Sequence, residues 1–511
     1  MMKYFAWSIS LLVGLMSLGQ EMLWFRVISF MLGGAPFAFA LVLFFFLVGI
    51  AYGANRGKTI CTRYSNLFFA GGVVLIFAGF IDISIPFIIL QISQNHAIEL
   101  PLFLCFILIF FVAALKAILF PIVHHLGTNI ANGKVGASVS KVYFFNIIGS
   151  TLGSLLIGGI LLDYVSISSM FILIGIVCIL IGSLMAVKKS VSSMITIVML
   201  GCGCFYLVDK HTDYIFKTLY GKKQEISVNT YIENRYGVIH IVNDDKVGMK
   251  NIVLGNNIYD GMINIDPDND INDLNRLYLL AAVHPNPKKV LVIGVSAGAW
   301  TRALSSFPTL ETIDAIEINK GYIDIIKQYP VVSPILNDPK INIYIDDGRR
   351  WLKRNSDKKY DLIIMNTTYH WRSGTTNLLS QEMMKIAENS LNPDGILAFN
   401  STRSPDTLKT AQSVFKYAYW GKLGFIYASD SMIKIDEVVA KDRLDKLILD
   451  GKPLFNEESK QRENGAYKKT LSTQLLTLDE FEKLQNLGRD LEIITDSNMI
   501  TEYKYGLFGK E

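Results

Sequence analysis

Cysteine is missing from most of this chain. All five cysteines precede residue 209, so the remaining residues hold no disulfide and no thiolate metal site. The seven histidines show no spacing typical of metal ligands, and we predict no metal. No basic tract with interleaved aromatic residues occurs, and the net charge of +4 is small for 511 residues. Nucleic acid is therefore not an expected partner.

Charged residues are scarce in the first 208 residues, where the apolar content is concentrated. A hydrophobic fraction of 51% and a mean hydropathy of +0.33 are too high for an ordinary soluble protein. The first apolar run is too long for a signal peptide, and no cleavage site follows it. Because about 20 apolar residues cross a bilayer as a helix, we predict a helical transmembrane domain over 1–208. Its spans would lie near 5–32, 36–54, 67–90, 100–121, 141–162, 168–187 and 192–208.

Several polar residues interrupt these spans. Gln20, Glu21 and Arg26 lie in the first span, and Lys116 lies in the fourth. Because an ionisable group in hydrocarbon is costly, such residues indicate either a functional site or internal ion pairs. The suggested pairs are Glu21 with Arg26 or with Lys116, while residues near the span ends reach the interface. The fifth span carries small residues, which we interpret as a helix-packing face and not as a substrate path: Asn146, Gly149, Ser150, Gly153, Ser154, Gly158 and Gly159.

The composition changes after residue 208. Over 209–273 apolar and polar residues alternate, as in Gly237–Val242 and Lys250–Leu254. Asn-Asp-Asp and Gly-Asn-Asn separate these runs, so we predict a small β domain of hairpins, with a simple spacer as the alternative. Further on, we predict a C-terminal extension over 431–511. Its charged and weakly periodic segment, Asp436–Lys469, is interpreted as a lid or a mobile insert.

A glycine-containing loop stands at the centre of the remaining sequence. The segment 288–300, Lys-Lys-Val-Leu-Val-Ile-Gly-Val-Ser-Ala-Gly-Ala-Trp, passes from a β-branched run through glycines into a helical pattern. Gly294 can take a positive φ, and Gly298 allows the backbone to approach a ligand beside a helix N-terminus. No Gly-Lys-Ser or Gly-Lys-Thr follows, so ATP hydrolysis is disfavoured.

Polar residues also follow three further predicted strands. The strand 312–318 ends in Glu317, where folds of this type place a carboxylate that accepts two ribose hydroxyls. The strand 341–345 runs into Asp346-Asp347-Gly348, and the strand 360–365 runs into the segment 366–372. Because the carboxyl ends of parallel strands line one crevice, the four loops predict a single nucleoside site. We predict a Rossmann-like α/β domain over 274–430.

Several short segments together resemble one family. Over about 234–400 the chain is similar to the spermidine synthase-like aminopropyltransferases, in particular the bacterial form fused to a multi-span membrane domain. The resemblance implies a methyltransferase-type core that binds S-adenosylmethionine, its decarboxylated form or methylthioadenosine. The segments that carry it are His284-Pro285-Asn286-Pro287-Lys288-Lys289-Val290-Leu291, Glu317-Ile318-Asn319, Asp347-Gly348, Tyr360-Asp361-Leu362-Ile363 and Asn392-Pro393-Asp394-Gly395.

The resemblance also implies roles for individual residues. Gly294 and Gly298 would flank the nucleoside. Glu317 would hold the ribose, and Asp347 would accept a hydrogen bond from the adenine amino group. The other cofactor-binding residues would be Ser296, Asn319 and Gly348.

The chain departs from the family pattern at the expected catalytic position. After the fourth strand the family carries an Asp that assists deprotonation of the attacking amine, with a second acid three residues on. Here these positions hold Asn366 and Tyr369. The Tyr-and-Glu run that helps to hold a diamine is also missing from 272–283. Because two positive amines without compensating charge are costly to bury, we predict that putrescine is not the acceptor.

The loop that carries Asn366 offers other chemistry. His370 could act as a general base near neutral pH or could only fix the loop, and both interpretations stay open. Tyr369 and Trp371 could stack on an acceptor or on a sulfonium, while Arg372 could clamp an anionic group. We predict Asn366, Tyr369 and His370 as catalytic residues. Trp371 and Arg372 would bind an uncharged or anionic acceptor, either a small molecule or a lipid head group.

These observations predict a membrane-bound transferase that uses an S-adenosyl nucleoside. A methyltransferase on the same fold and a transporter or sensor with a non-catalytic nucleoside domain are the alternatives. Basic residues between the spans place the N-terminus in the cytoplasm. Because S-adenosyl nucleosides are made inside cells, we expect 192–208 not to cross fully, which leaves the catalytic domain at the cytoplasmic side of a bacterial plasma membrane. A homodimer is compatible with the sequence, which leaves the oligomeric state open.

Overall fold

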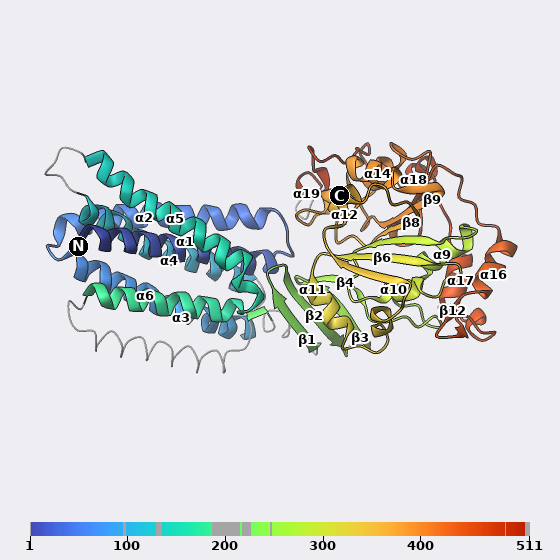
Figure 1. Cartoon of the computed structure of the whole chain (residues 1–511), viewed down its shortest axis with the longest axis horizontal. Helices are drawn as coiled ribbons and strands as arrows, with labels where there is room; N and C mark the ends of the chain where they lie inside the picture. The colour runs from blue at the N-terminus through green and yellow to red at the C-terminus, as the bar shows by residue number, and fades with distance from the viewer. Residues whose placement is uncertain are drawn as a thin grey trace. The chain divides into compact units, whose positions relative to one another are not determined.

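The chain forms two compact units, Met1–Val238 and Ile239–Glu511, in a computed structural model. The structure describes residues 2–95, 99–128, 135–186, 215–216, 226–245, 248–485 and 487–505. The first unit contains long apolar helices that lie side by side (Figure 1). They are α1 (Met2–Met31), α2 (Phe37–Arg63), α3 (Leu67–Asn95), α4 (Glu99–Gly127), α5 (Val135–Gly159) and α6 (Ile167–Ala186), with the short η1 (Leu161–Asp163) after α5.

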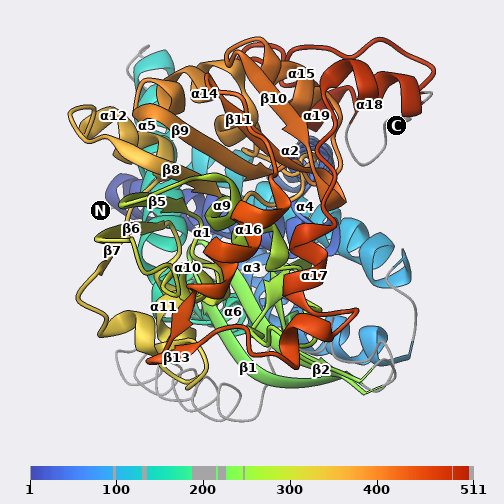
Figure 2. The same cartoon turned by 90° about the vertical axis from the view of Figure 1, so that its right-hand side faces the viewer.

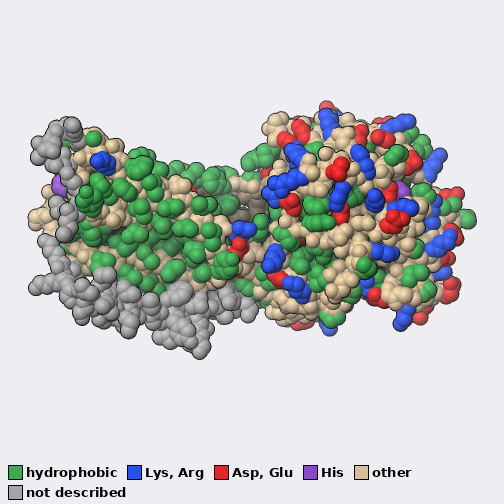
Figure 3. All heavy atoms as spheres, in the orientation of Figure 1, with side chains coloured by type: hydrophobic (Ala, Val, Ile, Leu, Met, Phe, Trp, Pro, Cys, Tyr) green, Lys and Arg blue, Asp and Glu red, His purple; other side chains and the backbone are tan. Residues whose placement is uncertain are grey.

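Six of the helices that the structure describes are long and apolar enough to cross a membrane. They coincide with the first six predicted spans, whereas the predicted seventh span, 192–208, lies outside the described residues. Hydrophobic side chains are abundant on the described part of the face of this unit that is shown, and charged side chains are few there (Figure 3). These helices indicate a multi-pass membrane protein.

Small residues bring α1 and α5 close together. A Cβ atom at Gly149 or at Gly153 would collide with the backbone of α1, at the carbonyl oxygens of Leu11 and Leu15. The side chain of Asn146 adds a hydrogen bond of 3.1 Å from its Nδ2 to the carbonyl oxygen of Ser10. The small-residue face of the fifth span is therefore a helix-packing face, as predicted.

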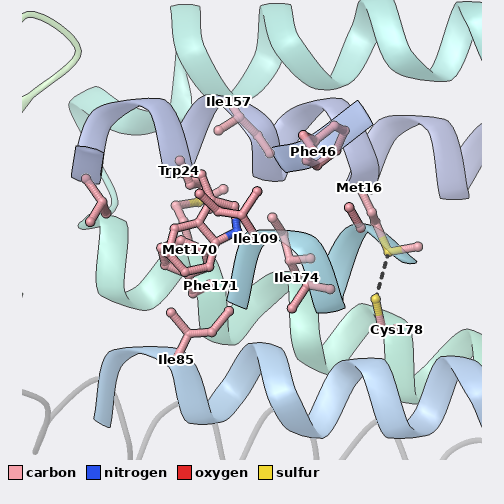
Figure 4. Packing of buried hydrophobic residues seen from close by; sticks show 14 of the residues in the cluster. Met16, Trp24, Phe46, Ile85, Ile109, Ile157, Met170, Phe171, Ile174 and Cys178 are labelled. Atoms are coloured by element: carbon pink, nitrogen blue, oxygen red, sulfur yellow. Dashed lines mark hydrogen bonds between the residues drawn. The ribbon is translucent and has the colours of Figure 1, made fainter. Parts of the chain in front are cut away.

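Large apolar side chains fill the middle of the helical unit. Trp24 of α1 packs edge-on against Phe171 of α6, with ring centroids 5.0 Å apart (Figure 4). The Sγ atom of Cys178 lies 3.5 Å from the Sδ atom of Met16. These side chains are buried, so the helices are held by close packing around a shared core.

A polar cluster, here called the bundle triad, lies within this core and consists of Gln20, Asp82 and Lys116. The Nζ atom of Lys116 lies 2.8 Å from Asp82 Oδ2 and also donates to Gln20, whose Nε2 donates to Asp82 Oδ1 at 2.5 Å. The suggested pairing of Glu21 with Lys116 is therefore wrong. Arg26 donates to the backbone carbonyl oxygens of Asn234 and Arg235.

A four-stranded antiparallel sheet follows the helices. Its order is β1 (Ile226–Asn234), β2 (Gly237–Asp244), β3 (Met249–Gly255) and β4 (Ile258–Met262), so neighbouring strands are also consecutive in the chain. The predicted hairpins are therefore present. Asn256 and Asn257, between β3 and β4, both take positive φ angles, as a tight hairpin turn requires.

The second unit is built on a seven-stranded mixed sheet, which is the predicted α/β fold. Figure 2 shows its strands following one another across the unit in the order β10, β11, β9, β8, β5, β6, β7. The five strands from β9 to β7 are parallel. The chain adds β6 and β7 on one side of β5 and then β8 and β9 on its other side, so the strand order reverses between β5 and β8. Ligands bind at such a switch point in open α/β sheets. The strands are β5 (Lys289–Ile293), β6 (Thr312–Glu317), β7 (Ile341–Ile345), β8 (Tyr360–Met365), β9 (Leu391–Asn400), β10 (Tyr417–Trp420) and β11 (Phe425–Ser429).

Helices cover this sheet and connect its strands. They are α9 (Asn275–Val283), α10 (Ala299–Leu304), α11 (Lys320–Ile326), η2 (Ser333–Leu336), α12 (Gly348–Arg354), α13 (Thr376–Leu379), α14 (Gln381–Glu388), α15 (Asp406–Gln412) and η3 (Lys422–Gly424). The core strands are apolar on both faces, because successive side chains such as Val290, Leu291 and Val292 of β5 are fully buried.

The segment interpreted as a lid or mobile insert forms regular elements. They are α16 (Glu437–Asp445), β12 (Ile448–Leu449), β13 (Lys452–Pro453), η4 (Ser459–Gln461) and α17 (Ala466–Leu471), followed by α18 (Leu478–Leu484) and α19 (Ile500–Tyr503). Helices α16 and α17 pack against α9. Arg443 of α16 donates to the carbonyl oxygen of Ala282 at 2.9 Å, so this segment covers α9.

Candidate functional site

A cavity of about 370 Å³, here called the first cavity, opens at the carboxyl ends of β5, β6, β7 and β8. The structure thus brings together the four loops that the sequence assigned to one nucleoside site. Among the predicted cofactor-binding residues, those that line the first cavity are Gly294, Ser296, Glu317, Asp347 and Gly348, and Asn366 joins them.

Glycine is required where the loops after β5 and β8 meet. Gly294 has a φ of 84°, and a Cβ atom there would lie 2.7 Å from the carbonyl oxygen of Asn366. Gly298 has a different surrounding. With a φ of 88° it precedes α10, and its Cβ atom would lie 2.9 Å from the side chain of Ile335. Gly298 is absent from the lining of the first cavity, so it serves the packing of η2 against this loop.

Glu317 ties the loops after β5 and β6 together. Its carboxyl group accepts hydrogen bonds from the backbone N–H groups of Ser296, at 3.0 Å, and Asn319, at 2.9 Å. Asn319 turns its own side chain to Gly321 and caps α11. Burial raises the pKa of Glu317 to about 7, although these backbone hydrogen bonds act in the opposite direction. Near pH 7 the protonated and ionised forms of this carboxyl group are therefore both populated.

Two acids follow β7 and have different surroundings. Asp347 begins α12 as its N-cap, with its carboxylate accepting from the backbone N–H of Arg350 at 2.8 Å. Asp346 forms an ion pair with the side chain of Arg350. Both acids line the first cavity, so α12 presents its N-terminus there.

Asp260 of β4 is a site residue that the sequence prediction missed. It lines the first cavity, receives a hydrogen bond of 2.5 Å from the hydroxyl of Tyr322, and accepts through its carbonyl oxygen from Ser296 Oγ at 3.1 Å. Burial raises the pKa of this carboxyl group. Its sequence signal was weak, because Tyr-Asp-Gly is also an ordinary turn sequence.

A second cavity, of about 160 Å³, adjoins the first. Asp260, Asn366 and Thr368 line both cavities. The other residues of the second cavity are Tyr259, Gly261, Asn272, Asp273, Arg276, Trp300, Thr367, Tyr369, Asn400, Thr402, Arg403 and Leu423. The predicted catalytic residue Asn366 therefore stands between two cavities, and Tyr369 stands on the wall of the second.

The remaining residues of the predicted acceptor loop lie behind this wall. Trp371 packs on Tyr369, with ring centroids 5.8 Å apart. Arg372 donates to Thr368 Oγ1 at 2.6 Å. Trp371, Arg372 and His370 are absent from the lining of both cavities. They support Thr368 and Tyr369, which do face the second cavity.

His370 holds a backbone turn after β9. Its backbone N–H donates to Thr402 Oγ1 at 2.7 Å, and its Nδ1 lies 3.1 Å from the carbonyl oxygen of Thr402. Thr402 and the adjacent Arg403 both have left-handed backbones, with φ angles of 50° and 74°. This conformation is unfavourable for residues other than glycine and needs support from its surroundings. The contacts favour the loop-fixing interpretation of His370.

The guanidinium of Arg276 lies beside two aromatic rings that contact each other edge to face, with centroids 5.6 Å apart. It is 5.2 Å from the ring centroid of Trp300 and 5.3 Å from that of Phe425. Its Nε donates to the carbonyl oxygen of Asp273 at 2.9 Å. Arg276 was also missed by the sequence prediction, because its position on α9 showed no recognised motif.

The C-terminal segment secures one wall of the first cavity. Glu502 of α19 is buried and accepts from the backbone N–H groups of Gly374 and Thr376, each at 2.9 Å. Asp496 forms an ion pair of 2.5 Å with Arg349. Because Gly374 lines the first cavity, the shape of this wall depends on residues far along the chain.

The strand order and the cavity at the strand ends define a Rossmann-like α/β domain. Residues 278–418 match the model of the spermine/spermidine synthase domain. The C-terminal part of the chain thus contains such a domain and is homologous to polyamine aminopropyltransferases.

The relatives give the extent of this match. A polyamine aminopropyltransferase of Streptococcus uberis is 32% identical over 162 residues, which are 32% of this chain and 54% of the relative. That of Clostridioides difficile is 40% identical over 125 residues, or 24% of this chain and 44% of the relative. The chain spans about half the length of these curated relatives.

Two solved structures of spermidine synthases align with part of this chain. A spermidine synthase from Thermotoga maritima aligns with a TM-score of 0.37 and 20% identity, over 45% of this chain and 82% of that one. A spermidine synthase in complex with the transition state analogue AdoDATO aligns with a TM-score of 0.40 and 19% identity, over 51% of this chain and 88% of that one.

Proposed function

We propose that the chain is a membrane-bound transferase that moves an aminopropyl group from decarboxylated S-adenosylmethionine to an acceptor other than a simple diamine. The observation that carries this proposal is the position of Asn366, which lines both cavities. A group transferred between two bound molecules must pass such a shared wall. The spermine/spermidine synthase domain supports the choice of aminopropyl transfer.

The first cavity would hold the nucleoside. Glu317 would accept from the ribose hydroxyls, and Asp347 would accept from the adenine amino group. Gly294, Ser296 and Gly348 would allow the nucleoside to approach the backbone closely. Each role agrees with the place of the residue on the cavity wall.

The transfer itself is a displacement at carbon. A lone pair of the acceptor nucleophile forms a bond to the aminopropyl carbon, and the bond from that carbon to sulfur breaks. The electron pair goes to sulfur, which leaves as the thioether of methylthioadenosine, and the nucleophile then releases its proton to water. The protein contributes mainly by holding the two reactants in line.

A diamine acceptor does not fit the polar groups near Asn366. The carboxamide of Asn366 has no charge and cannot take up the proton of an ammonium group. The remaining acid at the shared wall is Asp260, which already accepts a hydrogen bond from Tyr322. An acceptor with less positive charge than putrescine is therefore favoured.

The location follows from the helices and from the source of the nucleoside. Six spans with a cytoplasmic N-terminus would place the catalytic domain in the cytoplasm of a bacterial cell, with the lipid bilayer as the partner of the helical unit. We keep a small molecule and a lipid-like compound as acceptor classes, and a homodimer as an assembly to be measured.

Product analysis tests the proposal. The full chain in detergent would be incubated with decarboxylated S-adenosylmethionine or with S-adenosylmethionine, together with a membrane and metabolite extract. Release of methylthioadenosine is expected. Release of S-adenosylhomocysteine would instead identify a methyltransferase, and binding without either product would identify a sensor or transporter. The Glu317→Ala variant should lose product formation at low nucleoside concentration.

A further inference from the structure

The charges on the wall of the second cavity are balanced. Its lining includes two acidic residues, Asp260 and Asp273, and two arginines, Arg276 and Arg403. Asp273 also lies 3.6 Å from the Nζ atom of Lys469. The wall therefore has no excess of negative charge with which to compensate a dication.

Arg276 is prepared to bind an oxyanion. Its guanidinium packs against the edge-to-face pair of Trp300 and Phe425, which restricts its position, and its hydrogen bonds go to the backbone carbonyl oxygens of Asp273 and Asn272, at 2.9 and 3.5 Å. Among the residues that the structure describes, Arg276 forms no ion pair. A fixed guanidinium with donors left over matches the two oxygens of a carboxylate or phosphate.

Arg403 is the second cationic residue of this wall, and its backbone has an unfavourable left-handed conformation. It follows Thr402 in the left-handed turn that His370 holds, and its exposed side chain forms no ion pair within the described part of the chain. Two consecutive left-handed residues other than glycine cost free energy, which indicates that the position of this turn matters at the site.

We infer that the second cavity binds an acceptor that carries an acid group, a carboxylate or a phosphate, in addition to its amine nucleophile. Arg276 and Arg403 hold the acid group. The amine lies toward Asp260 and Asn366, which also face the nucleoside cavity. This inference rests on the proposed function and specifies its acceptor class.

Calorimetry on the full chain in detergent, with methylthioadenosine bound, tests this inference with three probes. 4-Aminobutyrate carries an amine and a carboxylate, O-phosphoethanolamine carries an amine and a phosphate, and putrescine carries two amines. At least one acid-bearing probe should bind at least tenfold more tightly than putrescine. The Arg276→Gln and Arg403→Gln variants should each weaken that probe by tenfold or more, while methylthioadenosine affinity, which reports correct folding, stays unchanged.

Two control variants sharpen the result. Arg276→Lys keeps the charge but loses the two parallel donors, so it should recover only part of the affinity. Arg462→Gln removes a guanidinium from the surface pair with Glu458 and should leave all three probes unaffected.

Several results would overturn the inference. They are tighter binding of putrescine, no binding of either acid-bearing probe, or an acid-bearing probe that binds unchanged after both arginine substitutions. If methylthioadenosine still bound, the proposed function would survive the last two results, whereas tighter binding of putrescine would also overturn its exclusion of a diamine acceptor. Repeating the titrations without nucleoside separates a failure of this inference from a failure of the proposed function. Even if the protein has no nucleoside site, these titrations still measure whether binding of the acid-bearing probe depends on Arg276.

Discussion

Lys116 in the helical unit and Arg276 in the α/β unit are both largely withdrawn from water, and they differ in their partners. Lys116 contacts the carboxylate of Asp82 at 2.8 Å and the amide of Gln20. Arg276 contacts aromatic rings and backbone carbonyl oxygens, and no carboxylate neutralises it directly. A charge that is satisfied within the chain holds the fold, whereas a charge that lacks its counter-ion is available to a ligand. The predictions below test this distinction.

The largest effect is expected in the bundle triad. Asp82→Ala should lower the free energy of unfolding by about 3–5 kcal/mol, because it leaves Lys116 buried without its counter-ion. The double variant Asp82→Leu with Lys116→Met should recover most of this loss. Thermal unfolding in detergent measures both, with the exposed Arg63→Ala as a control. Asp82→Ala with wild-type stability would show that Lys116 does not depend on this pair.

A smaller effect is expected at the nucleoside carboxylate. Glu317→Ala should weaken methylthioadenosine binding by about 1–3 kcal/mol, because the ribose hydroxyls lose their acceptor. Glu311→Ala, which removes an exposed acid paired with Lys288, is the matched control and should bind normally. Unchanged calorimetric affinity in the Glu317 variant would show that the nucleoside does not bind at this end of the first cavity.

The pKa of Glu317 predicts how nucleoside binding depends on pH. Its pKa is raised to about 7 by burial, so the group is mostly protonated at pH 6 and mostly ionised at pH 8. Ribose hydroxyls donate to the ionised form, and affinity should rise by up to about tenfold across this interval. The stability of the free protein depends on pH in the opposite direction. A carboxyl group whose pKa is raised by folding contributes to the free energy of unfolding at low pH, and this contribution is lost as the pH rises through 7. Glu317→Gln should abolish both trends.

Substitution of His370 should affect binding of the acceptor and not the chemical step. His370→Gln should weaken acceptor binding by about 1 kcal/mol through loosening of the Thr402 turn. KM for the acceptor should increase, while the pH dependence of kcat stays the same. A general base would behave differently, since its loss would lower kcat and remove the acidic limb of the profile, where the base becomes protonated.

The smallest effect is expected at Asn366. The unchanged protein should not convert putrescine to spermidine, and Asn366→Asp should restore little, because Tyr369 and the second cavity also differ from a diamine site. Mass spectrometry of the products measures this directly, with Asn377→Asp on the wall of the first cavity as a control for added charge. Rapid spermidine formation by the unchanged protein would refute the argument from the missing acids.

The sequence predicted the features that depend on local pattern. The bounds of β7 and β8 were predicted to the residue, and the loops after β5, β6, β7 and β8 do meet at one cavity. These features follow from β-branched runs and from the rule that parallel strands end at one edge.

Features that depend on distant partners were not predicted. The partner of Lys116 is Asp82, which lies in another helix and was not considered. Arg276 lines the second cavity and packs against Phe425, which lies far along the chain. His370 was placed beside the reacting groups by its sequence position, but it faces Thr402. Such contacts are set by tertiary packing, which no local pattern records.

The hydrogen bonds of Glu502 have a consequence for the synthesis of the chain. Glu502 holds the backbone at Gly374 and Thr376, although 126 residues separate Thr376 from it. A ribosome that adds 5–20 residues per second needs roughly 6–25 s to reach Glu502 after making Thr376. During this interval the wall of the first cavity lacks its carboxylate clamp. Newly made chains therefore acquire a complete first cavity late, after the strands that form its floor have left the ribosome.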